Sequence, residues 1–542
     1  MPFENRWRIT GVLTTIVPLH IGDGGVTTRT DLINEKEKDE VEISSVATDH
    51  EGRAYLPGKT LKGNLRTWLS TPTDAPSALI ESVFGSEDPG SRDAVGGKAE
   101  FWDALVDVTP TTAPRVPYWD AKRLAGVAAS VAIDRKTRTA SHTKLFHEEF
   151  VPPGVSFAVT ITGQDLTPDE LALLLFALEG FNNSETPASL GADTGDQQGR
   201  LTWRLRDIAR LRKEEVLAWA QRQNPPVAYN GLISLRDDER QALLAQAQTL
   251  GRARPRAFIT LTLDLHFEGP FLVNDPSKTR KEKDREQSQN EEERTPDHEP
   301  LRNHEGRLLL PARSIRGAVR SQAEKIVRTL NPNGACLSVD PEHACPAIYD
   351  APLRATHLCL TCQAFGAPGW RAPVEFSDFL PAQGGEGVPF YQEMLAIDRF
   401  TGGSARHFKF NACAVYRPIL TGTMTVDLHR IDPWALGLFA LALRDLIEGD
   451  IPLGFGAAKG YGACRATIRG IRITNLSDIP AEFQAILKNN DALQIDLNSL
   501  DTTSKPEDEI ALVLMALISA FQSQVASFQK VSEEKGNTND LS

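Results

Sequence analysis

The chain has 542 residues, of which 41% are hydrophobic and 24% are charged, a composition typical of soluble globular proteins. Its length exceeds that of one ordinary domain. Its formal net charge of -13 means that any contact with nucleic acid must depend on local clusters of Lys and Arg, because phosphates need positive potential.

No apolar stretch reaches the length of a membrane helix, and the first residues lack the charged-then-apolar pattern of a signal peptide. We therefore expect no membrane partner and a cytoplasmic location.

A set of short motifs occurs twice in the same order, which indicates a duplicated domain. The first copy contains residues 56–66 (LPGKTLKGNLR), 84–85 (FG), 100–103 (EFWD), 132–135 (AIDR) and 190–191 (LG) with Gly199. The second contains residues 310–320 (LPARSIRGAVR), 365–366 (FG), 375–378 (EFSD), 396–399 (AIDR) and 453–454 (LG) with Gly462.

These repeats divide the chain into four parts. We assign residues 1–205 to the first domain, 206–255 to a helical linker, 256–472 to the second domain and 473–542 to a C-terminal helical extension with a disordered tail. Each repeat reads as an alternating strand, a polar insertion, a basic helix, further strands and a capped helix. This succession predicts an α+β, ferredoxin-like unit, a fold that serves many functions.

Basic side chains follow each Pro turn at spacings of three and four, so each set lies on one helix face. The two sets are Lys59, Lys62 and Arg66, and Arg313, Arg316 and Arg320. Later in each repeat a glycine loop precedes a strand, and the second loop carries Lys459. Such loops either bring backbone N–H groups close to an anion or serve as plain helix-to-strand turns.

Four of the six cysteines lie in an insertion, residues 334–364, that only the second repeat has. They are Cys336, Cys345, Cys359 and Cys362, with the spacing C-x8-C-x13-C-x2-C. The last pair has the tight spacing of tetrahedral zinc sites. A loop-rich insertion needs a cross-link to stabilise it, and in a reducing compartment that cross-link is not expected to be a disulfide. We therefore expect structural zinc, with free thiols as the alternative.

Taken together, the repeated motifs resemble the RAMP superfamily of CRISPR-associated RNA-binding proteins, and within it the backbone subunits of type III interference complexes. A chain with two such units is similar to the double-backbone fusions of subtype III-D. The resemblance implies two tandem ferredoxin-like (RRM-like) domains with inserted loops and a thumb hairpin in each. It also implies three kinds of partner: a guide CRISPR RNA, a paired target RNA and other type III effector subunits.

In this family the basic helix clamps the guide backbone, and the segment that starts with AIDR begins the thumb hairpin, which crosses the guide–target duplex. The resemblance therefore implies phosphate contacts by both basic sets and Lys459, and by the hairpin residues Arg135, Arg138 and Arg399. Surface solubility is the alternative role for these residues.

The family cleaves target RNA with a loop aspartate and a divalent ion, magnesium or manganese. In the second repeat Asp297 stands fourteen residues before Pro311, with Arg294 and His298 beside it to offset phosphate charge or move protons. The same count back from Pro57 reaches Ile43, next to Glu42, which leaves cleavage by the first repeat open.

Three functions follow from the resemblance. The favoured one is a metal-dependent endoribonuclease that acts within a ribonucleoprotein of antiviral defence. The second is a non-catalytic structural backbone subunit. The third is a guide-processing endonuclease, which needs a catalytic histidine near the first helix; His20 is available, but it lies in the apolar alternation of the first strand.

Overall fold

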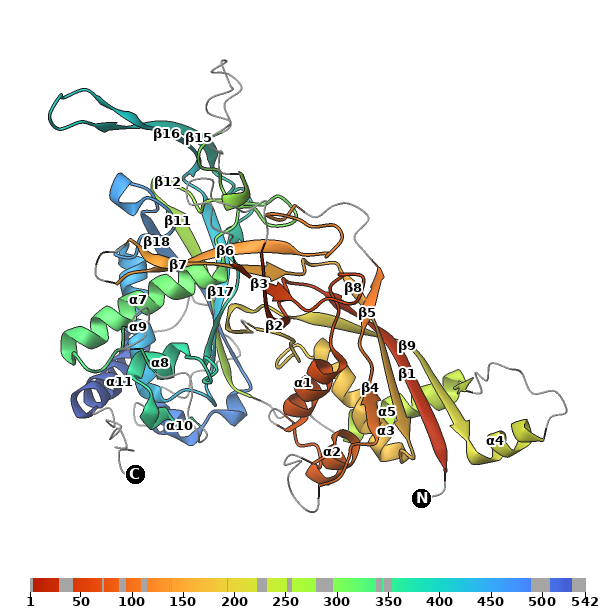
Figure 1. Cartoon of the computed structure of the whole chain (residues 1–542). Helices are drawn as coiled ribbons and strands as arrows, with labels where there is room; N and C mark the ends of the chain where they lie inside the picture. The colour runs from red at the N-terminus through yellow and green to blue at the C-terminus, as the bar shows by residue number, and fades with distance from the viewer. Residues whose placement is uncertain are drawn as a thin grey trace, which may run out of the picture. The chain divides into compact units, whose positions relative to one another are not determined.

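The computed structural model describes residues 3–28, 42–70, 73–86, 94–108, 115–135, 137, 139–192, 194–221, 232–250, 256–278, 296–337, 344–345, 353–488 and 507–528. The chain forms two compact units (Figure 1). One comprises Met1–Ser130 and Phe146–Pro255, and the other comprises Val131–Leu145 and Arg256–Ser542. None of the helices in the described part of the chain combines the length and apolarity that a membrane crossing requires.

The first unit is built on a sheet with the strand order β10-β9-β1-β8-β4, and β5 also pairs with β8. Its strands are β1 (Asn5–Thr15), β4 (Ala99–Phe101), β5 (Leu105–Val108), β8 (Ser156–Gln164), β9 (Leu201–Arg212) and β10 (Ile233–Ser234). Its helices are α1 (Gly58–Ser70), α2 (Ser77–Phe84), α3 (Pro168–Glu179), α4 (Lys213–Ala220) and α5 (Asp237–Leu250). Apolar residues of β1, α1 and α3 share one buried cluster, so these helices pack on the sheet.

The second unit repeats this topology. Its sheet has the order β13-β17-β11-β18, with β14 also paired to β17. Its strands are β11 (Phe258–Phe267), β13 (Val374–Phe376), β14 (Leu380–Pro381), β17 (Ile419–Asp427) and β18 (Cys464–Thr474). The first strand even carries a register shift at the same place, between Thr10 and Gly11 in β1 and between Thr262 and Leu263 in β11. The predicted duplication and the α+β, ferredoxin-like class are confirmed.

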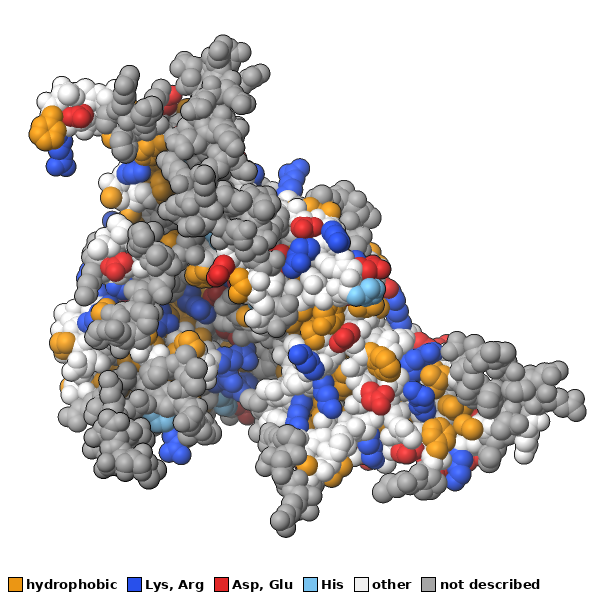
Figure 2. Space-filling view, in the orientation of Figure 1, with side chains coloured by type: hydrophobic (Ala, Val, Ile, Leu, Met, Phe, Trp, Pro, Cys, Tyr) orange, Lys and Arg blue, Asp and Glu red, His pale blue; other side chains and the backbone are white. Residues whose placement is uncertain are grey.

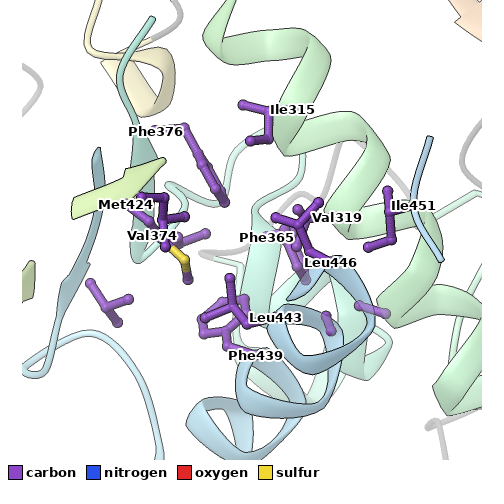
Figure 3. Packing of buried hydrophobic residues seen from close by; sticks show 14 of the residues in the cluster. Ile315, Val319, Phe365, Val374, Phe376, Met424, Phe439, Leu443, Leu446 and Ile451 are labelled. Atoms are coloured by element: carbon purple, nitrogen blue, oxygen red, sulfur yellow. The ribbon is translucent and has the colours of Figure 1, made fainter. Parts of the chain in front are cut away.

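In the core of the second unit, one apolar cluster joins the sheet to the helices (Figure 3). The helices are α7 (Ala312–Leu330), α8 (Leu360–Phe365), α9 (Pro433–Glu448), α10 (Ala481–Lys488) and α11 (Glu507–Ser527). Ile315 and Val319 of α7 meet Phe365 of α8, Phe376 of β13 and Phe439 of α9, and all five side chains are buried.

A further helix covers the capped helix of each unit: α5 packs on α3, and α11 packs on α9. The second contact is close, since a Cβ at Gly437 would lie 2.2 Å from the carbonyl oxygen of Leu517. The segment predicted as a linker therefore supplies the end of β9 and the packing helix α5. The C-terminal extension supplies the corresponding helix α11.

Each repeat also carries a smaller sheet that includes a long hairpin. In the first repeat it has the order β2 (Gly22–Thr28), β3 (Glu42–Val46), β7 (Ala140–Phe150), β6 (Gly126–Ile133). In the second it has the order β12 (Pro270–Phe271), β16 (Ser404–Tyr416), β15 (Val388–Ile397). The aspartates of the repeated AIDR motif close the hairpin turns. Asp134 Oδ1 accepts a hydrogen bond from Thr137 N at 2.8 Å, and Asp398 Oδ1 accepts one from Phe400 N at 2.7 Å.

The EFxD motifs cap the basic helices. Asp103 Oδ1 accepts a hydrogen bond from Gly58 N, and Asp378 Oδ1 accepts one from Ala312 N, both at 2.8 Å. Each carboxylate thus satisfies an N–H group in the first helical turn, where negative charge also complements the helix dipole. Burial raises the pKa of Asp378 despite this bond. The two motifs therefore fix where each basic helix starts relative to its sheet.

Candidate metal centre and nucleic-acid interface

The basic helix of the first unit buries Leu61 and Leu65 and turns Lys59 and Lys62 toward solvent. Lys59 is exposed and Lys62 is half-buried. Within the part of the chain that the structure describes, no carboxylate lies at ion-pair distance from either lysine. Figure 2 shows basic side chains gathered over the region of α1. These two ammonium groups are therefore placed to meet an anionic partner.

On α7, Arg313 and Arg316 occupy the corresponding positions and are half-buried. Ile315, one residue before Arg316, and Val319, three residues after it, are buried in the core. The helix therefore keeps the apolar face of α1 on the sheet and its basic face partly open.

The third basic residue of each set is used within the fold. Arg66 Nη1 donates to the carbonyl oxygen of Ser86 at 3.1 Å, and Arg320 Nη1 donates to that of Gly366 at 2.9 Å. Both acceptors lie just after the short helix that follows the basic one, α2 or α8. These two arginines hold helix pairs together.

The four predicted cysteines come together. Their Sγ atoms all lie within 4.8 Å of one another, and the sulfurs of Cys336 and Cys362 are 3.5 Å apart. Zinc–sulfur bonds of about 2.3 Å give a tetrahedron with sulfur–sulfur edges of about 3.8 Å. The donor set, its spacing and its burial therefore fit one tetrahedral metal ion. Leu353, Leu358 and Trp370 pack around it.

The four sulfurs are close enough to shift one another's pKa. The contact with Cys336 is the main cause that lowers the pKa of Cys345 to about 7 and also lowers that of Cys359, whereas contacts within the same cluster raise the pKa of Cys336 and of Cys362. Arg320 Nη2 donates to Cys362 Sγ at 3.2 Å. Burial opposes the charge of Arg320, but the negative charges of Cys362 and Glu324 raise its pKa overall. Thiolates are the form that binds metal.

Outside this cluster, Cys464 is buried and Cys413 is half-buried. Burial raises the pKa of Cys464 to about 12.

Asp297 is buried against strand β16 of the second hairpin. Its side chain is 6% exposed, and Oδ2 accepts a hydrogen bond from Asn411 N at 2.9 Å. In return Asp297 N donates to Asn411 Oδ1 at 2.7 Å. Asn411 Nδ2 in turn donates to the hydroxyl of Tyr391. The loop and both hairpin strands are thus joined through one carboxylate–amide pair.

Beside Asp297 lies an aromatic and basic cluster that the sequence did not indicate. The ring of His298 is 4.7 Å from that of Phe455 and 6.1 Å from that of Phe410. Lys459 Nζ sits over both phenylalanine rings, 4.3 Å from the centroid of Phe410 and 5.0 Å from that of Phe455. The glycine loop, the hairpin and the loop of Asp297 therefore meet at one place. Arg294 lies outside the described residues.

The first repeat has a different set at the same place. Ile43 and Asp297 each stand fourteen residues before the Pro turn of their repeat, and both segments run parallel to a hairpin strand, through Ile43 and His147 in the first repeat and through His298 and Ala412 in the second. Ile43 is fully buried, whereas Glu42 is exposed at the start of β3. The position at which the sequence lacks an aspartate is therefore occupied by a buried apolar side chain.

His20 is part of the fold of the first unit. It is 7% exposed, and its Nδ1 lies 2.6 Å from the carbonyl oxygen of Glu149. Its Nε2 lies 3.6 Å from Glu148 Oε1. With both ring nitrogens facing protein oxygens, this histidine is a poor base for a guide-processing reaction.

The hairpin tips differ. Arg135 belongs to the segment Val131–Leu145 of the second unit, where its Nε donates to Glu324 Oε2 at 3.0 Å. Arg399, the equivalent residue, is exposed, and Phe400 next to it is 100% exposed. Figure 2 shows a hydrophobic and a basic side chain at the free end of this hairpin. Arg138 lies outside the described residues.

The fold and these surfaces define a class of protein: a duplicated ferredoxin-like chain with one basic helix per repeat and a four-cysteine centre in the second. The family model of the RAMP superfamily matches residues 12–202 and 258–465, one match in each repeat. The chain therefore belongs to the RAMP superfamily. Membership supports a role as an RNA-binding subunit of a CRISPR-associated complex. A comparison with curated proteins found no match.

Proposed function

We propose that this chain is a double backbone subunit of a type III CRISPR effector complex and holds the guide RNA along both repeats. One observation carries the proposal: the same capped helix occurs in both units and has two basic residues off its buried apolar face, Lys59 and Lys62 or Arg313 and Arg316. Paired cations on a rigid helix suit RNA phosphates, which are contacted without regard to base sequence.

The net charge of the chain agrees with an RNA-binding surface that is confined to these helices. A chain of net charge -13 repels RNA elsewhere, so its grip depends on local positive potential and weakens as salt rises. The partners that we propose are a guide CRISPR RNA, a paired target RNA and neighbouring effector subunits.

The test is guide binding by charge-reversed variants of the full chain. We expect Lys59→Glu with Lys62→Glu to weaken binding at least about tenfold and to lower the slope of log affinity against log salt by about 0.7 per lost phosphate contact. The matched control, Lys122→Glu with Lys325→Glu, makes the same charge change at two exposed lysines, one in each unit and neither on these basic faces. An equal loss in both pairs would show a general charge effect and refute the proposal.

We further propose that the second repeat cleaves the paired target RNA and that Asp297 is the residue responsible. The support is its place: it precedes His298, whose ring contacts Phe455, and Lys459 Nζ sits over that same phenylalanine ring. A divalent ion, magnesium or manganese, would supply charge to offset the phosphate. The apolar Ile43 at the equivalent position makes the first repeat a binding unit only.

Two matched variants separate catalysis from folding. Asp297→Asn keeps an acceptor for Asn411 N but removes the charge, whereas Asn411→Ala breaks the mutual contact and keeps the carboxylate. In the assembled complex we expect the first to reduce one cleavage product by a factor of about 100 or more, with guide binding retained. We expect the second to retain most cleavage. Undiminished cleavage with Asp297→Asn would leave the structural backbone subunit as the function.

A further inference from the structure

The helix beside the four cysteines is longer than its counterpart. Helix α1 has 13 residues and ends at Ser70, whereas α7 has 19 and continues past Glu324, which occupies the position of Ser70. The added turns carry Arg328. The insertion with the cysteines and the extension of α7 therefore occur together in the second repeat and are both absent from the first.

One face of the extended helix reaches both ends of the cysteine set. Arg320 Nη2 donates to Cys362 Sγ at 3.2 Å, and Arg328 Nη1 donates to the carbonyl oxygen of Cys336 at 3.1 Å. Between them Glu324 accepts from Arg320 Nε at 3.0 Å and lies 3.5 Å from Arg328 Nη2. Arg320, Glu324 and Arg328 are spaced by four residues, so they form one row along the helix.

The guanidinium of Arg320 has little capacity left for another ligand. Its Nε, Nη1 and Nη2 donate to Glu324, Gly366 and Cys362 respectively, and its side chain is only 17% exposed. Each of its three nitrogens thus already has a partner within the protein.

The charges around Glu324 balance a metal-loaded site. Glu324 is fully buried and pairs with three guanidinium groups, those of Arg320, Arg328 and Arg135, which leaves two positive charges. A divalent ion held by four thiolates carries two negative charges. Four neutral thiols would leave the two positive charges uncompensated in a buried place, which is costly.

We propose that Arg320 is a positioning residue of the metal centre: its N–H···S bond stabilises the metal-bound thiolate of Cys362 and ties the occupied centre to α7. The proposal requires that the four cysteines bind a metal ion but does not depend on RNA cleavage. Donors outside the coordination sphere orient ligands and tune the metal, and their loss costs about 10- to 100-fold in affinity.

The test uses the full chain with two probes, zinc and cobalt(II). We expect Arg320→Ala to weaken zinc binding by about 10- to 100-fold and to shift the thiolate-to-cobalt charge-transfer band. Arg320→Lys should give an intermediate loss, because lysine keeps the charge but not the fork of three donors. The matched control is Arg316→Ala, one turn earlier on the same helix, which should retain zinc affinity and the cobalt spectrum.

Guide binding gives a second readout that separates this proposal from the proposed function. We expect Arg316→Ala to lose guide affinity and keep zinc affinity. We expect Arg320→Ala to lose more zinc affinity than guide affinity. If Arg320→Ala does not fold, Glu324→Gln takes its place, because it removes the carboxylate that orients Arg320 and should also speed zinc release. Wild-type zinc affinity and cobalt spectrum in these variants would overturn the proposal, as would wild-type protein that binds neither metal.

Discussion

At the scale of single residues, buried charges in this protein serve several partners at once. Glu170 is 4% exposed at the start of α3 and accepts from Lys98 Nζ at 2.8 Å and from Thr167 N at 2.8 Å. It also accepts from the hydroxyl of Ser82 on α2. With Thr167 Oγ1 accepting from Glu170 N, the pair forms a capping box. One carboxylate thus links two helices and the segment before β4.

Glu170 should make the first unit sensitive to acid. Burial raises the pKa of Glu170, but its bonds to Lys98, Ser82 and Thr167 outweigh this and lower it overall. A depressed pKa contributes stability that is fully present above about pH 4.5 and is lost as the pH falls through the lower folded value. We expect Glu170→Gln to cost about 1–3 kcal/mol at pH 7 and less at pH 3.

Urea unfolding of the full chain at several pH values measures this, with Glu81→Gln, an exposed site on α2, as the control. If the loss of unfolding free energy caused by Glu170→Gln did not change with pH, Glu170 would act through its shape rather than its charge.

At the scale of elements, the two hairpins share a closing aspartate but present different tips. The first tip has Lys136 where the second has Phe400. The β15–β16 hairpin also exposes Tyr391, Leu395 and Ile397, by 52%, 54% and 67%. An apolar wedge on a rigid ribbon can separate stacked bases, as minor-groove proteins do. We therefore predict that the second hairpin, rather than the first, opens the duplex.

Substituting Phe400 should affect the paired target and not the guide. We expect Phe400→Ser to leave guide affinity unchanged and to reduce the fluorescence rise of 2-aminopurine placed in the target strand, because the base then stays stacked. Phe400→Trp should preserve the signal. Scanning the fluorophore along the target locates the step; a full signal at every position with Phe400→Ser would rule out the wedge.

At the scale of the whole molecule, the repeats are alike where they hold RNA in our proposal and unlike where chemistry is possible. Both have the same sheet order, capped helix and covering helix. Among the described residues, only the second has the cysteine cluster and the lysine over two aromatic rings. At the position of Lys459 the first repeat has Asp196, which is buried. The two repeats thus share the sheet and its packed helices, and they differ in their loops and at the C-terminal end of α7.

Local patterns were enough to predict much of this. Motif order showed the duplication, alternation and helical spacing showed the α+β class, and cysteine spacing showed the cluster, because these properties depend on residues close in sequence. The family match agrees with the same motifs. The basic faces of α1 and α7 follow from helical periodicity alone.

Only the tertiary structure decided how the third arginine of each basic set is used. Arg320 reaches Cys362 and Gly366, which lie 42 and 46 residues further along the chain, and Asp297 meets Asn411 across 114 residues. Periodicity fixes the face on which a side chain lies, whereas its partner is set by which distant segment packs there. The sequence alone therefore determined two similar folds with one basic helix each, and long-range packing decided which partners their charged residues meet.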